Sequence, residues 1–191
     1  DKKRVITVGG GIGIAPGYPI ARGYKQHGAE VINIIGARTQ SLLVYEDKMR
    51  EISDELIVCT DDGSYGRKGV VTEPLKEILD KDPNFDVCLA IGPAIMMKFV
   101  AEATKPYGIK TIVSLNSVMV DGTGMCGGCR VDVGGETFYT CVDGPEFDAH
   151  KVDFDLLMTR QSTYKEHEKQ ALERWKHKCR LDSAQPNITQ E

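Results

Sequence analysis

The 191 residues are enough for one sizeable hydrophobic core with a small module appended to it. The net charge of −4 disfavours a general nucleic-acid binder, and no apolar run is long enough to cross a bilayer, so we expect neither a nucleic-acid nor a membrane partner. The chain opens on Asp1 without a signal peptide or an initiator Met, and we therefore expect it to be cut from a longer protein.

Short apolar runs alternate with segments of helical spacing along the first 115 residues. The runs are almost continuously apolar, as strands buried on both faces of a parallel sheet require. We therefore predict an α/β fold with a five-stranded parallel sheet and helices on both of its faces. The expected strands are 4–8, 31–35, 56–59, 85–90 and 109–115, and the expected helices are 13–27, 41–52 with Ser41 as its cap, 70–80 and 94–104.

The composition changes after the fifth strand. Residues 121–135 contain six glycines, too many for a packed helix or a regular strand, and we expect a small Gly-rich module over 116–150. A helical pattern returns over 151–182. The last residues, 183–191, are expected to form a disordered tail.

The predicted C-terminal helix differs in charge from the rest of the chain. Residues 151–180 carry eight Lys or Arg against five Asp or Glu, while Leu172, Trp175 and Cys179 fall on one helical face. We expect this helix to dock against a partner subunit or another domain. The alternative is that it packs on its own chain.

A glycine-rich loop follows the first strand and precedes the first helix. Gly9, Gly10, Gly11 and Gly13 stand within five residues. Glycine lets the backbone approach a phosphate closely, and a helix N-terminus presents free N–H groups to the anion. The alternative is a turn that needs glycine only for its backbone angles. We predict a phosphate-binding loop, and hence a nucleotide-binding domain over residues 1–115.

This loop is not the Rossmann fingerprint. Ile14 stands where the third glycine would be, and Gly36-Ala37-Arg38 replaces the acidic residue expected after the second strand. The ribose is therefore not expected to be held by a carboxylate. The loop 60–69 after the third strand is long and polar, and it should lie at the same edge of the sheet. Asp61, Asp62 and Ser64 in that loop fit a binding site or a solvated turn equally well.

Three cysteines and an aspartate have the spacing of an iron–sulfur site. The pattern Asp121-x4-Cys126-x2-Cys129-x11-Cys141 matches plant-type [2Fe–2S] proteins, except that Asp121 occupies the first ligand position. A zinc knuckle normally supplies two Cys-x2-Cys pairs, and a redox Cys-x-x-Cys pair leaves Cys141 unexplained. The clustering of cysteines favours a metal site in a reducing cytoplasm. Asp121 itself fits either a ligand or a turn residue.

The loops of the first domain resemble one superfamily. Gly-Gly-x-Gly-x-Ala-Pro after strand one, Gly-Ala-Arg after strand two and Gly-Pro after strand four are similar to the nucleotide domain of ferredoxin–NADP reductases. The resemblance implies that the first loop holds pyrophosphate and that the Gly92-Pro93 loop places nicotinamide against a flavin. Ile91 stands where that family usually has Cys, so a thiol contact to the nicotinamide is not expected.

The cysteine-rich segment resembles a narrower family. The run from Asp121 to Arg130, followed by 141–150, is similar to the small FAD-containing subunit of NADH-dependent reduced ferredoxin:NADP oxidoreductase, also known as sulfide dehydrogenase beta subunit. That family implies an Asp and three Cys as cluster ligands, here Asp121, Cys126, Cys129 and Cys141. The electron-transfer subunit of dihydroorotate dehydrogenase is a cousin with four Cys. The resemblance covers residues 4–160.

The resemblance also implies a function. The nucleotide, NAD(H) or alternatively NADP(H), exchanges a hydride with FAD. Electrons then pass through the [2Fe–2S] cluster to a larger flavin and iron–sulfur partner subunit, and through that subunit to ferredoxin. The FAD-binding barrel that precedes the first strand in the family is absent from this chain, so the fragment alone is not expected to be active. No catalytic side chain is expected, because the cofactors carry the chemistry. The alternatives are a dihydroorotate dehydrogenase electron-transfer subunit and a nucleotide- and redox-sensing module without turnover.

The expected nucleotide site gathers the loops at the carboxyl edge of the sheet. Arg38, Arg67 and Lys68 are candidates for binding a 2′-phosphate, or are solvated charges. The expected cofactor-binding residues are Gly10, Gly11, Ile12, Gly13, Ala15, Pro16, Gly36, Ala37, Arg38, Asp61, Asp62, Ser64, Gly92, Pro93 and Met96.

Overall fold

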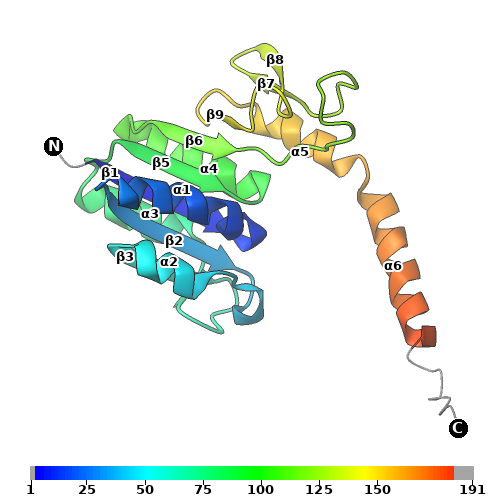
Figure 1. Cartoon of the computed structure of the whole chain (residues 1–191), viewed down its shortest axis with the longest axis horizontal. Helices are drawn as coiled ribbons and strands as arrows, with labels where there is room; N and C mark the ends of the chain where they lie inside the picture. The colour runs from blue at the N-terminus through cyan, green and yellow to red at the C-terminus, as the bar shows by residue number, and fades with distance from the viewer. Residues whose placement is uncertain (1–2, 183–191) are drawn as a thin grey trace, which may run out of the picture.

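The computed structural model describes residues 3–182, with side chains described through Lys176. The expectation of a disordered tail at 183–191 and the side chain of Cys179 lie outside this part of the chain. Figure 1 shows a twisted sheet with helices on both sides and a long helix that extends away from it. No helix in the described part of the chain combines the length and apolar character needed to cross a membrane.

The main sheet has seven strands in the order β4-β3-β2-β1-β5-β6-β9. All neighbouring pairs are parallel except β6 and β9, which are antiparallel. The five predicted strands are present, and two short edge strands are added to them. The strands are β1 (Arg4–Gly10), β2 (Glu30–Ala37), β3 (Glu55–Thr60), β4 (Arg67–Lys68), β5 (Val87–Ile91), β6 (Thr111–Ser114) and β9 (Glu146–Asp148).

Helices cover both faces of the sheet, as predicted from the sequence. The α-helices are α1 (Ile14–Gln26), α2 (Glu46–Ile52), α3 (Thr72–Lys81), α4 (Ala94–Thr104), α5 (Phe154–Ser162) and α6 (Lys165–Asp182), and 3₁₀ turns lie at Gly11–Gly13, Gln40–Leu42 and Lys105–Tyr107.

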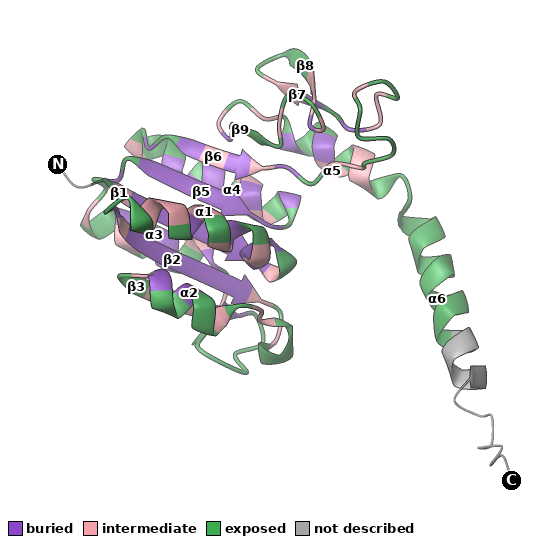
Figure 2. Ribbon diagram, in the orientation of Figure 1, coloured by how far each residue is buried: buried purple, intermediate pink, exposed green. Residues whose placement is uncertain are grey.

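Alternate residues of each strand supply the two halves of the core. Val5 and Ile35 pack with α1 and α2, whereas Ile6 and Ile34 pack with α3, α4 and α5. This alternation follows from the two-residue period of a β-strand. Figure 2 shows the central strands buried along their whole length, which explains their continuous apolar sequence.

Two predicted helices differ from the structure. The helix expected over 41–52 begins only at Glu46, because Tyr45 takes a left-handed φ of 61° that interrupts a helix, and Ser41 lies in the preceding 3₁₀ turn instead of capping it. The single helix expected after Asp153 is two helices, broken at Thr163 and Tyr164. The run of Ser, Thr and Tyr there has modest helix propensity.

The Gly-rich segment contains a small hairpin that the glycine count had argued against. β7 (Arg130–Val133) and β8 (Glu136–Tyr139) pair antiparallel, and Gly134 and Gly135 turn between them with φ of 69° and 86°. Such positive angles at both turn positions favour glycine. Strand β9 then returns to the main sheet, so the predicted 116–150 module shares that sheet with the predicted nucleotide domain.

Candidate functional site: two loop clusters

The glycine loop lies where the strand order reverses. From β1 the chain moves outward to β2 and β3, while β5 and β6 lie on the other side of β1. Crevices outside the carboxyl ends of parallel strands at such a switch point are where open α/β sheets bind ligands. Gly10 pairs in register with Gly36, and Gly9 pairs with both Ile35 and Ile91, so the predicted loops meet at one edge.

The glycines at this edge of the sheet serve different structural purposes. A Cβ on Gly13 would overlap the carbonyl of Ile91, and one on Gly92 would lie 3.1 Å from the Cα of Gly10. These glycines are needed for the first loop to pack against the Gly92-Pro93 loop. Gly11 instead has a φ of +55° and open space where a side chain would be. Packing therefore explains Gly13 and Gly92, whereas Gly11 leaves an open approach to the backbone.

The start of α1 is free of competing side chains. No side chain caps the helix at Gly13, and its first turn contains no acidic residue. The first N–H groups of a helix lack acceptors within it, and here they belong to a turn whose Ile12 side chain is 79% exposed. This end of the helix suits an anion from solution.

The loops after β2 and β3 are joined by hydrogen bonds. The N–H of Asp61 donates to Ala37, and the N–H of Asp62 donates to Arg38, at 3.1 and 3.2 Å. Ser64 Oγ donates to Asp62 Oδ1 at 2.7 Å and accepts from the N–H of Gln40 at 2.9 Å. The hydroxyl and N–H of Ser64 lower the pKa of the Asp62 carboxyl. These contacts are those of a structural turn, and a contact to nucleotide stays a prediction for Asp61, Asp62 and Ser64.

The candidate 2′-phosphate residues are not equivalent. Arg67 makes a two-point contact with Glu77, its Nη1 and Nη2 lying 2.6 and 2.5 Å from the two carboxylate oxygens. Arg38 is exposed at the end of β2, on the same edge as the glycine loop. Of the candidates, Arg38 is therefore better placed than Arg67 to meet a phosphate.

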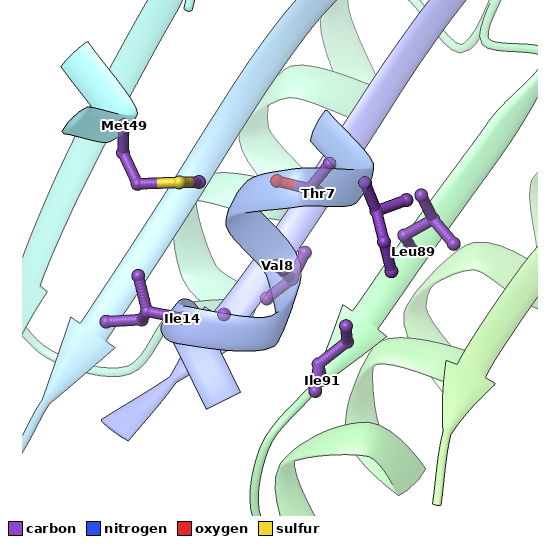
Figure 3. A pocket seen from close by; sticks show the side chains of 9 residues that line it. Thr7, Val8, Ile14, Met49, Leu89 and Ile91 are labelled. Carbon is purple, nitrogen blue, oxygen red and sulfur yellow. The ribbon is translucent and has the colours of Figure 1, made fainter. Parts of the chain in front are cut away.

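The enclosed space beneath α1 is not the nucleotide site. Figure 3 shows its walls, formed by side chains from β1, β5, α1 and α2. Its volume of about 10 Å³ admits at most about one water molecule. A dinucleotide therefore does not fit this space, and binding at the open edge of the sheet stays a prediction.

Two of the predicted cluster sulfurs lie together, and the Asp121 carboxylate contacts the backbone of Cys126. Cys129 Sγ lies 3.3 Å from Cys141 Sγ, and the N–H of Cys126 donates to Asp121 Oδ2 at 3.0 Å. Two thiolates on one tetrahedral metal at about 2.3 Å would lie roughly 3.7 Å apart. A [2Fe–2S] cluster has two irons and four protein ligands, and the Cys129–Cys141 pair matches two of these four. Within the described residues no three His, Cys, Asp or Glu side chains converge on one point.

The loop around these ligands presents backbone donors to sulfur. The N–H of Gly128 donates to Cys126 Sγ at 3.3 Å, and Gly122, Gly124 and Gly127 have φ of 73°, 83° and 66°. Hydrogen bonds of this kind are among the factors that tune a bound cluster. The donor set and the loop conformation therefore fit an iron–sulfur group.

The acid–base properties of the cysteine pair reflect its short separation. Burial alone would raise the pKa of the Cys129 thiol, but hydrogen bonds from Cys141 and Thr140 hold it below its usual value. The contact with Cys129 raises the pKa of Cys141. The short contact therefore shifts the pKa values of the two thiols in opposite directions.

Asp121 also serves the loop as a turn residue. Its Oδ1 accepts the N–H of Thr123 at 3.0 Å, and its Oδ2 accepts that of Cys126. The hydrogen bond from Thr123, followed by those from Cys126, lowers the pKa of this carboxyl, which keeps it ionised. An ionised carboxylate is the form that a metal binds, and ligation by Asp121 stays a prediction.

If Asp121 is only a turn residue, the fourth ligand would have to come from another Cys or Asp, and those that the structure describes are engaged elsewhere. Cys59 and Cys88 lie in the core of the main sheet and are at most 1% exposed. Asp132 accepts the N–H of Gly135 at 3.0 Å, and Asp143 accepts that of Tyr139 at 2.7 Å. Cys179 lies outside the described side chains.

Some contacts to the cluster loop were not anticipated from the sequence. Arg130 and Arg160 donate to carbonyls of the loop, and Gln161 donates to Asn116 at its start. The buried Thr140 donates to the Cys129 carbonyl at 3.2 Å. Arg130 stands beside Cys129 in the sequence, which is a signal, but nothing in the sequence places Arg160 or Gln161 near the loop.

Comparison with known proteins agrees with both loop clusters. Residues 7–102 match the model of the oxidoreductase NAD-binding domain. This chain belongs to that family. Residues 116–153 match a second model, the iron–sulfur cluster binding domain of dihydroorotate dehydrogenase B. The two matches cover the glycine loop and all four predicted metal ligands.

Two of the similar proteins are named as electron transfer subunits. A dihydroorotate dehydrogenase B (NAD⁺) electron transfer subunit homologue from Thermotoga maritima is 50% identical over 171 residues, which are 90% of this chain and 60% of that protein. A probable dihydroorotate dehydrogenase B electron transfer subunit from Methanocaldococcus jannaschii is 42% identical, over 79% of this chain and 57% of the relative. This chain thus spans about three fifths of the length of these relatives.

A solved structure resembles most of the chain. It is that of an NADH-dependent reduced ferredoxin–NADP oxidoreductase, described in terms of flavin-based electron bifurcation, with a TM-score of 0.81 and 48% identity. The match covers 91% of this chain and 62% of the solved one. The ferredoxin-reductase-like nucleotide fold expected from the loops is thereby confirmed.

Proposed function

We propose that this chain is the nucleotide-binding and iron–sulfur part of an NAD(P)H-dependent ferredoxin oxidoreductase subunit. NAD(H) binds at the switch point of the sheet, and a [2Fe–2S] cluster is held by Asp121, Cys126, Cys129 and Cys141. The observation that supports the proposal is the presence in one chain of an open glycine loop abutting Gly92 and of a loop in which the Cys129 and Cys141 sulfurs lie 3.3 Å apart. Either feature alone would fit many proteins.

In the nucleotide site, the chain's task is binding and orientation. The backbone from Gly10 to Gly13, with the start of α1 through Ala15 and Pro16, holds the pyrophosphate, as helix N-termini do. The Gly92-Pro93 turn and Met96 limit how the nicotinamide lies, and Gly36, Ala37 and Arg38 contact the adenosine end. No side chain is required as acid or base. When bound, FAD takes up the hydride and the cluster carries electrons one at a time.

In the cluster site, the chain's task is to bind iron and tune it. The free thiols of the described residues, from Cys59 to Cys141, are consistent with a reducing cytoplasm. Cys126 is exposed. This exposure supports electron exchange with a larger flavin and iron–sulfur partner subunit, and through it with ferredoxin. A flavin-binding segment in the part of the relatives that this chain does not span would complete the path.

The test uses the intact protein, including the segment that the relatives have and this chain does not. NADH should reduce bound flavin and then the cluster, followed by visible absorption and by EPR at low temperature. Iron and acid-labile sulfide should be present in equal amounts. A colourless protein with zinc, or a brown protein whose cluster NADH leaves oxidised, would contradict the proposal.

A second candidate is the electron-transfer subunit of a dihydroorotate dehydrogenase. It is favoured by the match of residues 116–153 and by the names of the relatives. Asp121 in place of a fourth cysteine argues for the first candidate. Reduction of NAD⁺ by dihydroorotate, measured on the protein co-purified with its partner subunit, would support this second candidate function.

A further inference from the structure

Two arginines hold successive peptide groups of the cluster loop. Arg130 Nη1 donates to the carbonyl of Gly127 at 3.0 Å, and Arg160 Nη2 donates to the carbonyl of Gly128 at 3.1 Å. Both carbonyls lie between Cys126 and Cys129. Arg130 begins β7, whereas Arg160 reaches the loop from the last turn of α5.

One of these peptide groups also contacts the cluster sulfur. The Gly127 carbonyl belongs to the same peptide group as the N–H of Gly128, which donates to Cys126 Sγ at 3.3 Å. A cationic donor on the carbonyl polarises the peptide and strengthens the bond that its N–H makes. Hydrogen bonds to sulfur and local charge are two of the factors that set cluster potentials.

Neither of these two arginines is among the ion-paired side chains of the described residues. The ion-paired arginines of the described residues are Arg4, Arg50 and Arg67. Arg130 and Arg160 instead line a cavity of about 360 Å³ between the cluster loop and α5. The lining of that cavity includes no Asp or Glu; its other residues are Ser117, Val118, Val120, Gly128, Leu157, Gln161, Thr163 and Tyr164.

The helix that supplies Arg160 is firmly held. Phe154 and Leu157 of α5 are buried in the main core, and Asp155 accepts from Lys98 of α4 at 2.7 Å. Gln161, beside Arg160, donates to the Asn116 carbonyl at 2.9 Å, at the other end of the loop. The last turn of α5 thus fixes both ends of the segment that contains Asp121 and Cys126.

We propose that Arg130 and Arg160 are positioning residues that fix the Gly127–Cys129 backbone and raise the reduction potential of the cluster. The inference rests on the proposed function, because it requires an iron–sulfur group in this loop. A positive charge near the cluster stabilises its reduced form, which carries one more negative charge. Removing either guanidinium should therefore make reduction harder.

The test compares charge-removing and charge-keeping variants of the intact protein. In Arg130→Gln and Arg160→Gln the cluster should assemble with a more negative midpoint potential by EPR-monitored redox titration, and the double variant should shift further. Arg130→Lys and Arg160→Lys keep the charge and lose the planar fork. They should retain a potential near that of the unmodified protein but lose iron to a chelator roughly tenfold faster.

Arg22→Gln is the matched control, because Arg22 is an exposed arginine on α1, away from the loop. This variant should change neither the midpoint potential nor the rate of iron loss. If the midpoint potential, the EPR signal and the rate of iron loss are unchanged in both Gln variants, the inference is overturned and the proposed function is not affected. If a Gln variant retains no cluster, the matching Lys variant decides, and an unchanged rate of iron loss there overturns the positioning role. Absence of a cluster from the unmodified protein would overturn the proposed function itself, and the inference with it.

Discussion

The nucleotide edge and the cluster loop are built by opposite means. At the nucleotide edge, buried strands of a large sheet bring their backbone ends together, and the side chains there are mostly small. In the cluster loop, Cys126 is exposed, and the conformation depends on hydrogen bonds between single side chains and the backbone. The first site should therefore persist without its ligand, whereas the second should depend on iron, as metal-held segments generally do.

The largest effect should follow from removing a cluster thiol. In Cys126→Ser, Cys129→Ser or Cys141→Ser, the iron and acid-labile sulfide content after anaerobic purification should fall to the baseline, because the ligand spacing leaves no spare thiol in the loop. Thermal unfolding of the sheet should change little. Full iron and sulfide content in any one variant would remove that residue from the ligand set.

Cys59→Ala is the matched control for these variants. Cys59 is 1% exposed on β3, and burial raises the pKa of its thiol to about 11, so it is a poor ligand. Its replacement should keep the cluster and lower the free energy of unfolding by about 1 kcal/mol, through the small cavity left behind.

A smaller effect, confined to the other site, is expected from Gly11→Val. Valine adds bulk where the backbone must approach a phosphate and strains the φ of +55°, so affinity for NADH by calorimetry should fall at least tenfold. The cluster should be unaffected. Gly28→Val provides the comparison, because Gly28 also has a positive φ and open space around it but lies after α1, away from the carboxyl edge.

Both glycine variants should lose a similar 1–2 kcal/mol of stability, roughly, from backbone strain. Only Gly11→Val should weaken nucleotide binding. Equal nucleotide affinities in the two variants would show that the loop is only a turn.

Substitution of Asp121 should alter the cluster without abolishing it. Asp121→Cys completes a four-cysteine pattern and should assemble a cluster with a changed potential and EPR signal, because thiolate is a softer ligand than carboxylate. Asp121→Ala should give a labile cluster. The comparison is Asp132→Ala, which removes a carboxylate that accepts the Gly135 N–H in the β7–β8 turn. If Asp121→Ala matches Asp132→Ala in potential, signal and lifetime, Asp121 is a turn residue.

Removal of α6 should have the smallest effect on the stability and the nucleotide affinity of the chain. Residues 162–176 are all exposed, including Leu172 at 49% and Trp175 at 62%, and Figure 2 shows the described part of the helix uncovered on its visible side. Deleting residues from Tyr164 onward should leave thermal unfolding and NADH affinity unchanged while weakening assembly with a partner subunit in size-exclusion chromatography. Unfolding of the truncated protein would show instead that α6 packs on its own chain.

A milder variant of α6 sharpens this test. Leu172→Ser with Trp175→Ser removes the apolar stripe and keeps the helix, while Gln170→Ser changes a polar position of the same helix. Assembly should weaken in the first variant and not in the second.

The share of the structure that could be predicted from the sequence differs between these two regions for physical reasons. Buried parallel strands must be apolar and helices must follow them, so the sheet, the order of its loops and α4 were predictable. Strand β9 was not, since Glu146 and Asp148 are exposed and its pairing with β6 depends on the fold. The spacing of the cysteines is what cluster geometry requires, so a ligand set could be predicted from the sequence, and it stays a prediction. Contacts from α5 to the loop join residues more than thirty positions apart, and no local pattern encodes them.

The two edges of the main sheet have a consequence for assembly. Unpaired edge strands invite pairing with another chain, and proteins suppress this with short or charged edges. One edge here is β4, only Arg67 and Lys68, and the other is β9, with Glu146 and Asp148 exposed around Phe147. Neither offers a long apolar strand to a neighbour. Association with other subunits should therefore proceed through helices and loops, and the sheet should resist edge-to-edge aggregation even when the cluster is lost.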